Sequence, residues 1–296
     1  MRGEGPLRYP GAKSNLSAFV AAFLERHRLA GVSFIEPFGG SAAVSRHLLN
    51  KHLVSDAQIW ELDPGLYAFW RAVLYEPSKL IRRVAEAQVT LDEFDRCTAY
   101  LQALADAPDD EIEAGYAFLF LNRTSYSGIV GAGPIGGRSQ SSAYPLDCRF
   151  NKTAIEKQIR HLSTMRGRLV PNFGDGISAI AKATNSFVYA DPPYFSNGKK
   201  FYRKHFKTFD HYRLRMALRQ SQSLWLLSYD YDRKVEYLYR QFPTERIALY
   251  HSARGAGSKE ELIVSPLGFA GLLHGVAADT PALSYSRITL SKTWAQ

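Results

Sequence analysis

A carboxylate, two prolines and an aromatic ring stand together in the run Asp191-Pro192-Pro193-Tyr194, directly after the apolar segment 186–190. The prolines have no amide hydrogen, their φ is fixed, and each holds the residue before it extended. The Asp191 carboxylate and the Tyr194 ring are therefore kept at a fixed separation at the end of a strand, where open α/β sheets bind ligands. A purely structural turn would need neither side chain, so we interpret this motif as a reactive corner.

A second motif, Glu36-Pro37-Phe38-Gly39-Gly40-Ser41, links a predicted strand to a predicted helix. Glycines let the backbone approach a ligand closely, and a helix N-terminus offers free amide donors. Glu61 follows Gly40 by 21 residues, and Asp63 lies two residues further. A carboxylate at about this spacing can accept hydrogen bonds from ribose hydroxyls. This favours a nucleoside-containing cofactor over the alternatives of a tight turn and solvated acids.

Short apolar runs predict the strands that position these motifs. They are residues 32–36, 57–62, 169–173, 186–190, 224–229, 246–251 and 261–265. Amphipathic segments at 14–28, 42–51, 209–222 and 232–241 predict helices between many of them. This alternation indicates an α/β fold with a mostly parallel sheet that is covered on both faces.

One block, from about residue 65 to 165, breaks the alternation. It shows no convincing buried strand, and residues 66–74, 78–89, 91–105 and 109–122 all have helical patterns. The Gly/Ser-rich stretch 125–142 that follows is longer than an ordinary connection, and such loops are usually functional. We interpret the block as a helical insertion between the second and third strands.

Composition limits the class of protein. The 296 residues carry a formal net charge of +9, with a pI near 9.4, which favours a polyanionic partner over small substrates. The only two cysteines provide neither a disulfide framework nor a zinc cluster, so we expect a reducing cytosol. No signal peptide and no run of eighteen apolar residues is present, so we expect no membrane association.

The order of the motifs resembles that of the Dam-like, alpha-group DNA adenine methyltransferases. Tyr9-Pro10-Gly11-Ala12-Lys13 comes first, then the glycine motif, the helical insertion and Asp191-Pro192-Pro193-Tyr194. Further similar blocks lie at 120–123, 126–128, 209–214 and 259–262, so the resemblance extends from about residue 7 to 264. It implies a Rossmann-like methyltransferase sheet of about seven strands with a helical target-recognition insertion.

The resemblance also implies a cofactor, S-adenosyl-L-methionine, and a substrate, the exocyclic amine of adenine in double-stranded DNA. Tyr9, Lys13, Glu61 and Asp191 would contact the cofactor or the catalytic pocket, the glycine motif would lie under the cofactor, and Asp175 would lie near its adenine. Together with the spacing argument, this assigns to cofactor binding the residues Tyr9, Lys13, Glu36, Phe38, Gly39, Gly40, Ser41, Glu61, Asp63, Asp175 and Asp191.

The chemistry of the reactive corner agrees with that substrate. The lone pair of an adenine amine is delocalised into the ring, so two acceptors are needed to aim it at a methyl carbon. The Asp191 carboxylate and the Pro192 carbonyl can provide them, with Pro193 stiffening the turn and Tyr194 stacking on the base. The base must leave the duplex to reach such a pocket, which costs a few kcal/mol.

Basic and aromatic residues supply candidate DNA contacts. No acid occurs between Asp191 and Asp210, and we expect contacts from Lys199, Lys200, Arg203 and Lys204. A second basic stretch spans residues 149–168. Near the Gly-rich loop we expect contacts from Asn122, Arg123, Tyr126 and Arg138. The alternatives are a solvated basic face and, for Arg123, a helix C-terminal contact.

Some features limit the resemblance and leave alternatives open. Glu61 stands where the family usually has an aspartate, and residues 128–138 lack the polar hairpin of GATC-methylating members, so that target is not carried over. The alternatives are transfer to cytosine or RNA, an NAD-dependent oxidoreductase, and an inert nucleic-acid-binding module. No serine-hydrolase elbow and no metal-binding histidine pair occurs, so we expect no metal.

Our interpretation is a catalytic domain of residues 1–64 and 167–296 with a target-recognition insertion at 65–166. We expect a monomer or weak dimer that acts on DNA in the cytoplasm, at the nucleoid or as a phage-encoded enzyme. A partner nuclease of a restriction-modification system is one possible setting.

Replacing Lys199, Lys200 and Lys204 by neutral residues should weaken DNA binding and flatten its salt dependence. Each lost phosphate contact should reduce the slope of log K against log salt by about 0.9. Titrations of duplex DNA at several salt concentrations measure this slope. An unchanged slope would show that these lysines form only a solvated surface.

Overall fold

The computed structural model describes residues 5–8, 14–194, 206–250, 258–269 and 283–284. The predicted cofactor residues Tyr9 and Lys13 lie outside the described residues. So do four predicted DNA contacts, Lys199, Lys200, Arg203 and Lys204. Their roles stay predictions.

A single mixed sheet forms the centre of the molecule. Its strands are β1 (Val32–Glu36), β2 (Val54–Glu61), β3 (Leu169–Phe173), β4 (Ser186–Ala190), β5 (Leu224–Asp230), β6 (Thr244–Tyr250), β7 (Ser258–Val264) and the two-residue β8 (Leu283–Ser284). Their order is β3-β2-β1-β4-β5-β7-β6-β8, with β7 antiparallel to its neighbours β5 and β6. The seven predicted strands are confirmed, whereas β8 was not predicted. The order reverses between β1 and β4, which is where such sheets bind ligands.

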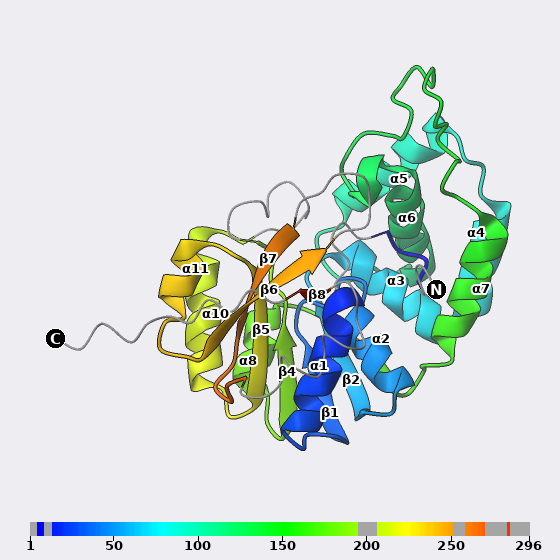
Figure 1. Ribbon diagram of the computed structural model, residues 1–296. Coiled ribbons are helices and arrows are strands. Elements are labelled where there is room, and N and C mark those ends of the chain that lie inside the picture. Colours follow the sequence, from blue (N-terminus) through cyan, green and yellow to red (C-terminus); the bar gives the residue numbers. More distant parts are fainter. Residues whose placement is uncertain (1–4, 9–13, 195–205, 251–257, 270–282, 285–296) are drawn as a thin grey trace.

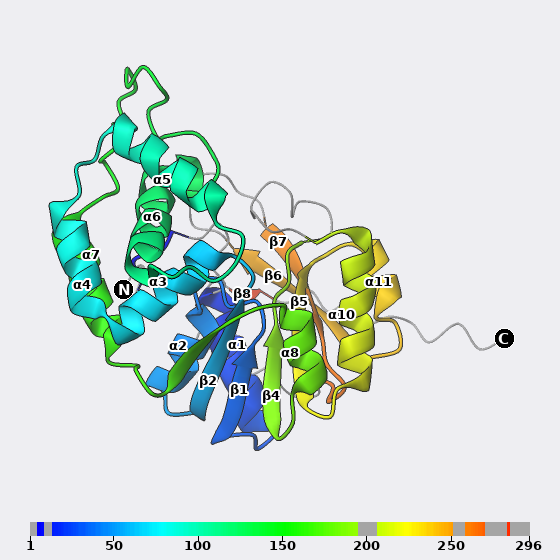
Figure 2. The same ribbon diagram turned by 180° about the vertical axis from the view of Figure 1, so that it is seen from behind.

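Helices cover both faces of the sheet (Figures 1 and 2). The hydrophobic cluster on one face includes α1 (Ser14–Arg26) and α2 (Ala43–Asn50). The cluster on the other includes α8 (Gly176–Lys182), α10 (Thr208–Gln220) and α11 (Arg233–Leu238). Because strand side chains alternate in direction, neighbouring residues of one strand join different clusters, as Phe34 and Ile35 do.

The insertion between β2 and β3 is helical, as predicted. It contains α3 (Pro64–Tyr75), α4 (Pro77–Glu86), α5 (Leu91–Ala103), α6 (Glu111–Thr124), the short 3₁₀ helix η1 (Tyr126–Gly128) and α7 (Lys152–Ser163). Most of these helices form a lobe to one side of the sheet (Figure 1). Helix α7 was not predicted, because its many basic residues hide the three buried ones, Ile155, Ile159 and Leu162. Helix α8 was also missed, and its seven residues are too few for a clear period.

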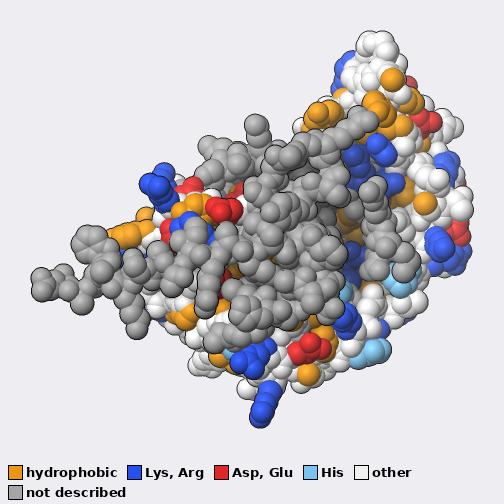
Figure 3. All heavy atoms as spheres, viewed as in Figure 1, with side chains coloured by type: hydrophobic (Ala, Val, Ile, Leu, Met, Phe, Trp, Pro, Cys, Tyr) orange, Lys and Arg blue, Asp and Glu red, His pale blue; other side chains and the backbone are white. Residues whose placement is uncertain are grey.

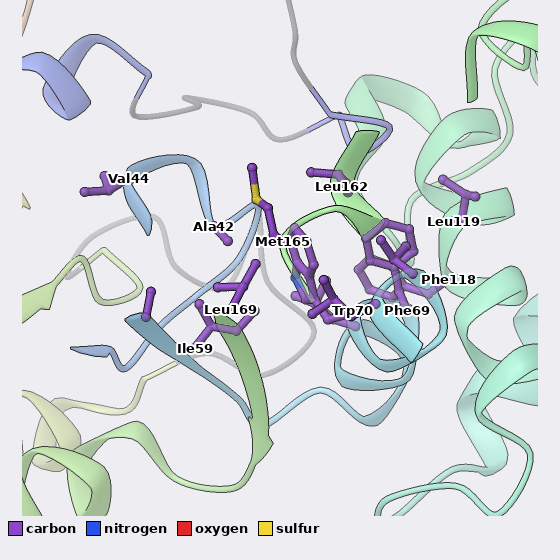
Figure 4. Packing of buried hydrophobic residues seen from close by; sticks show 14 of the residues in the cluster. Ala42, Val44, Ile59, Phe69, Trp70, Phe118, Leu119, Leu162, Met165 and Leu169 are labelled. Carbon is purple, nitrogen blue, oxygen red and sulfur yellow. The ribbon is translucent and has the colours of Figure 1, made fainter. Parts of the chain in front are cut away.

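The insertion and the sheet share one hydrophobic core. Phe69 and Trp70 of α3 lie beside Phe118 of α6 (Figure 4), and all three belong to the same hydrophobic cluster as Leu169 of β3. Helices α3 and α6 pack closely because α6 has a glycine at the crossing. A Cβ atom on Gly115 would lie 2.9 Å from both the Ala68 oxygen and the Phe69 Cα. Both are backbone atoms, so they cannot move aside like a flexible side chain.

Gly115→Ala should therefore separate α3 from α6 and lower the free energy of unfolding by about 1–3 kcal/mol. Chemical denaturation measures the change. Gly133→Ala is the matched control, because nothing lies within 4 Å of a Cβ at that position, and its stability should stay close to that of the unchanged protein. Equal effects of the two substitutions would contradict close helix packing at Gly115.

Candidate active site

Three carboxylates line up at the carboxyl ends of neighbouring strands. Glu61 ends β2, Glu36 ends β1, and Asp191 follows β4. Glu36 pairs with Ile59 across the β1–β2 ladder. Strand alternation puts all three side chains on the face that also carries Ile59, Phe34 and Tyr189. We call Glu61, Glu36 and Asp191 the acid row.

Glu36 is buried and holds the start of α2. Its Oε2 accepts hydrogen bonds from the Ser45 amide at 3.1 Å and from the Ser45 hydroxyl at 2.5 Å. The Ser45 amide is one of the free donors in the first turn of α2, so the Glu36 carboxylate caps the N-terminus of α2 although Glu36 belongs to β1. The pKa of Glu36 is raised to about 7. Burial raises it, the hydrogen bonds from Ser45 oppose the rise, and the nearby Asp191 charge adds to the rise.

Glu61 holds the glycine loop, residues 37–42. Its Oε1 accepts a hydrogen bond from the Gly40 amide. A Cβ on Gly39 would lie 2.8 Å from Ile59 Cβ and 3.1 Å from Glu61 Oε1, so the loop can lie this close to β2 only with glycine there. Burial raises the pKa of Glu61 well above its usual value, although the Gly40 amide opposes the rise.

Two residues that the sequence analysis did not single out complete the loop. The Trp70 indole of α3 donates to the Gly40 oxygen at 3.0 Å. Gly176 begins α8, and a side chain there would collide with the Pro37 oxygen. The one sequence signal that could have pointed to a role for Gly176 is a glycine that shortly follows a predicted strand.

Phe38 packs edge-on against Phe206 with ring centroids 5.4 Å apart. Ser41 is half-buried in the turn before α2.

The reactive corner lies beside the acid row. Asp191 Oδ1 accepts a hydrogen bond from the Ser228 hydroxyl of β5 at 3.3 Å. Pro192 is buried, Pro193 is half-buried, and the Tyr194 ring is 6% exposed. The structure thus brings Asp191 together with Glu36 and Glu61 at the point where the strand order reverses.

Asp63 and Asp175 both serve as helix caps. Asp63 Oδ1 accepts from the amides of Gly65 at 2.9 Å and Leu66 at 3.3 Å, at the start of α3. Asp175 accepts from the Ile177 amide at 3.1 Å at the start of α8, and pairs with Arg213 at 2.9 Å. Their predicted contacts with a cofactor stay predictions.

Asn122, which is predicted to contact DNA, is only 1% exposed, and that contact stays a prediction. Its Oδ1 accepts from the Arg8 amide at 2.6 Å, and its Nδ2 donates to the oxygens of Arg8 and Gly128, each at 2.8 Å. Asn122 therefore joins the N-terminal segment to the end of α6. The sequence could not show this, because Arg8 lies more than a hundred residues away.

Arg123 is also tied to the protein. It donates to the Arg149 oxygen at 2.6 Å and to the Pro6 oxygen at 3.4 Å, near the C-terminus of α6. Burial, together with the neighbouring guanidinium groups of Arg8 and Arg149, lowers the pKa of Arg123 to about 10. Both acceptors lie outside α6, so these contacts tie the end of α6 to neighbouring segments, and the DNA contact of Arg123 stays a prediction.

Arg138 and Tyr126 lie on the surface of the insertion. Both terminal nitrogens of Arg138 donate to the Asp95 carboxylate of α5, each at 2.7 Å. The ion pair is exposed, so solvent screens it and water can replace either partner. Tyr126 is 70% exposed and open to a base or a sugar.

Comparison with known proteins decides the family. The model of the D12 class N6 adenine-specific DNA methyltransferases matches residues 9–251, more than four-fifths of the chain. The chain belongs to this family. The methyltransferase is 25% identical over 206 residues to the Type II methyltransferase M.MjaIII of Methanocaldococcus jannaschii, covering 64% of this chain and 68% of that protein. It is 26% identical over 209 residues to the retron Ec67 DNA adenine methylase of Escherichia coli, covering 68% of each.

Among solved structures, the methyltransferase is similar to the rRNA methyltransferase aviRa of Streptomyces viridochromogenes. The identity is 12% and the TM-score 0.37, over 88% of this chain and 87% of that one. A likeness at this level does not bear on function.

The family confirms the expected enzyme class, an adenine-specific DNA methyltransferase, with DNA as substrate. The oxidoreductase, the inert binding module and transfer to cytosine or RNA are thereby set aside. Among the described residues, no helix is both long and apolar enough to cross a bilayer. In the same part of the chain, His, Cys, Asp and Glu side chains form no group of three that could hold a metal ion.

Glu36→Gln should change how stability depends on pH. Glu36 ionises near 4.5 in the unfolded chain but only near 7 when folded, so rising pH between these values lowers stability. The slope from this group approaches about 1.4 kcal/mol per pH unit. Glutamine can still accept from Ser45 but does not ionise, so the variant should gain stability relative to the unchanged protein from about pH 5 to about pH 7.

Chemical denaturation across this range measures the difference between the two proteins. The Glu36 charge also adds to the rise in the pKa of Glu61, so removing it relieves part of that rise and changes the stability difference in the same direction. A stability difference that stays constant with pH would contradict an ionisation of Glu36 near neutrality.

Proposed function

We propose that this methyltransferase takes its methyl group from S-adenosyl-L-methionine, bound at the acid row and the glycine loop. When bound, this cofactor supplies an activated methyl group on a positively charged sulfur. Two observations support the fit: Gly39 allows close backbone approach, and the acid row places three carboxyl groups together, whose ionised forms a bound cation would favour. Glu61 would accept from the ribose hydroxyls, and Phe38, Gly40 and Ser41 would lie under the cofactor.

We assign the reactive corner to the substrate base. The Asp191 carboxylate and the Pro192 carbonyl accept from the two hydrogens of the adenine amine and aim its lone pair at the methyl carbon. Asp191 need not be a strong base, because the methylated ammonium is acidic and loses its proton readily. The Tyr194 ring is 6% exposed, so a base that stacks on it must displace the protein atoms that now cover it.

We assign DNA binding to the insertion and to the basic segment after the reactive corner. Exposed Tyr126 and the outer end of Arg138 are the described candidates, and Lys199, Lys200, Arg203 and Lys204 are expected from the sequence. In Figure 3, Lys and Arg side chains gather on the insertion lobe toward the middle of the molecule. Such a surface neutralises phosphates while the target base is flipped out of the duplex.

We propose different roles for the insertion and for the rest of the chain. Residues 65–166 would recognise the target, and residues 1–64 and 167–296 would bind the cofactor and carry out the transfer. The insertion forms a lobe beside the carboxyl ends of the strands, which supports that division (Figure 2). We further propose that the enzyme acts in the cytoplasm as a monomer or weak dimer.

The observation that carries this proposal is the position of Asp191, next to Glu36 and at the reversal of strand order. Asp191→Ala should lower the transfer of labelled methyl groups from S-adenosyl-L-methionine to duplex DNA by about 100-fold or more, because it removes an acceptor for the amine. Mass spectrometry of nucleosides from DNA treated with the unchanged enzyme should show N6-methyladenine.

Asp56→Ala is the matched control. Asp56 is a carboxylate near the amino end of β2, away from the acid row, where it accepts hydrogen bonds from the hydroxyls of Ser33 and Ser55. This variant should methylate DNA at close to the normal rate, and both variants should stay folded by circular dichroism. Near-normal turnover by Asp191→Ala would overturn the assignment of the reactive corner.

A further inference from the structure

Two buried hydroxyl groups lie behind the Asp191 carboxylate. Ser228 Oγ of β5 donates to Asp191 Oδ1 at 3.3 Å, and the same oxygen lies 2.9 Å from the Tyr189 hydroxyl of β4. Ser228 is 0% exposed and Tyr189 is 1% exposed. Neither residue belongs to a motif of the sequence analysis, so their arrangement is apparent only in the structure.

Chemistry fixes the direction of both hydrogen bonds. An ionised carboxylate can only accept, so the Ser228 proton points to Asp191. Ser228 has one proton, and with it committed to Asp191 its oxygen must accept from Tyr189. The two hydroxyls therefore form a chain that runs from Tyr189 through Ser228 to Asp191, with each proton used once.

The central strands set the position of this chain. Tyr189 pairs with Leu226 and Ala190 with Leu227 in the parallel ladder of β4 and β5. The next step along the two strands puts Asp191 beside Ser228. The hydroxyl that meets the carboxylate is thus carried by a buried strand, which is more rigid than a surface loop.

We propose that Ser228 is a positioning residue for Asp191, and that Tyr189 orients the Ser228 hydroxyl. This inference rests on the proposed role of Asp191. The hydrogen bond fixes the rotation of the carboxylate, so that it faces an incoming amine in one orientation. A donor to the charged form also favours ionisation of Asp191, and the ionised carboxylate is the stronger acceptor for the amine hydrogen.

Other titratable groups also face Asp191. Glu36 on β1 and Tyr229 on β5 lie close enough for their charges to interact with it. Tyr229 in turn lies 2.6 Å from Nδ1 of His211 on α10. These three groups stay in place in every variant proposed below, so they affect all of the pH profiles alike.

Ser228→Ala tests the inference. We expect kcat for methylation of duplex DNA to fall by about 10-fold, with the KM for S-adenosyl-L-methionine changed by less than about twofold. Loss of the donor raises the pKa of Asp191, so the acidic limb of the kcat profile should move to higher pH by about 0.5–1 unit. Ser228→Thr keeps the hydroxyl and should restore both values. Tyr189→Phe should shift them in the same direction by a smaller amount.

Ser265→Ala is the matched control for stability. Ser265 is also 0% exposed and donates to the Trp225 oxygen at 2.8 Å, near the opposite end of β5. It should lower the unfolding temperature much as Ser228→Ala does, without moving the acidic limb. If Ser228→Ala and Tyr189→Phe change kcat and the acidic limb of its pH profile no more than Ser265→Ala does, Ser228 has only a structural role. Persistent turnover by Asp191→Ala would instead overturn the proposed function itself.

Discussion

Placing three carboxylates side by side at the edge of a buried sheet is the constraint on which this structure depends. Burial of ionised groups costs free energy unless donors or neutralisation compensate. Here Ser45, Gly40 and Ser228 each donate to one member of the acid row. Burial also raises the pKa values of Glu36 and Glu61, so the row carries less than its full formal charge near neutral pH.

The compensating donors also shape the surrounding backbone. The Ser45 amide starts α2, and the Gly40 amide belongs to the glycine loop, so both acids fix the segments that would hold the cofactor. A change at either acid would therefore affect folding as well as binding. The residues that we propose bind the cofactor are therefore also the ones that hold the local backbone.

Much of the fold could be predicted from the sequence, because buried parallel strands and the motifs at their ends are local patterns. The strands at 32–36, 169–173 and 186–190 have the predicted bounds. Contacts that depend on a distant partner could not be predicted from the sequence. Asn122 is engaged by Arg8, and Arg138 by Asp95, and no short pattern encodes either contact. Trp70 and Ser228 were missed for the same reason, since their partners are supplied by the tertiary fold.

The Trp70 hydrogen bond to the glycine loop has a consequence for exchanging sequence specificity between relatives. Trp70 lies in the first helix of the insertion, yet its indole holds the Gly40 oxygen. A chimaera joined at residue 65 would replace this anchor together with the helices that we propose recognise the target. A junction placed after α3 would keep the anchor with its own loop, so in such an exchange the junction belongs inside the insertion.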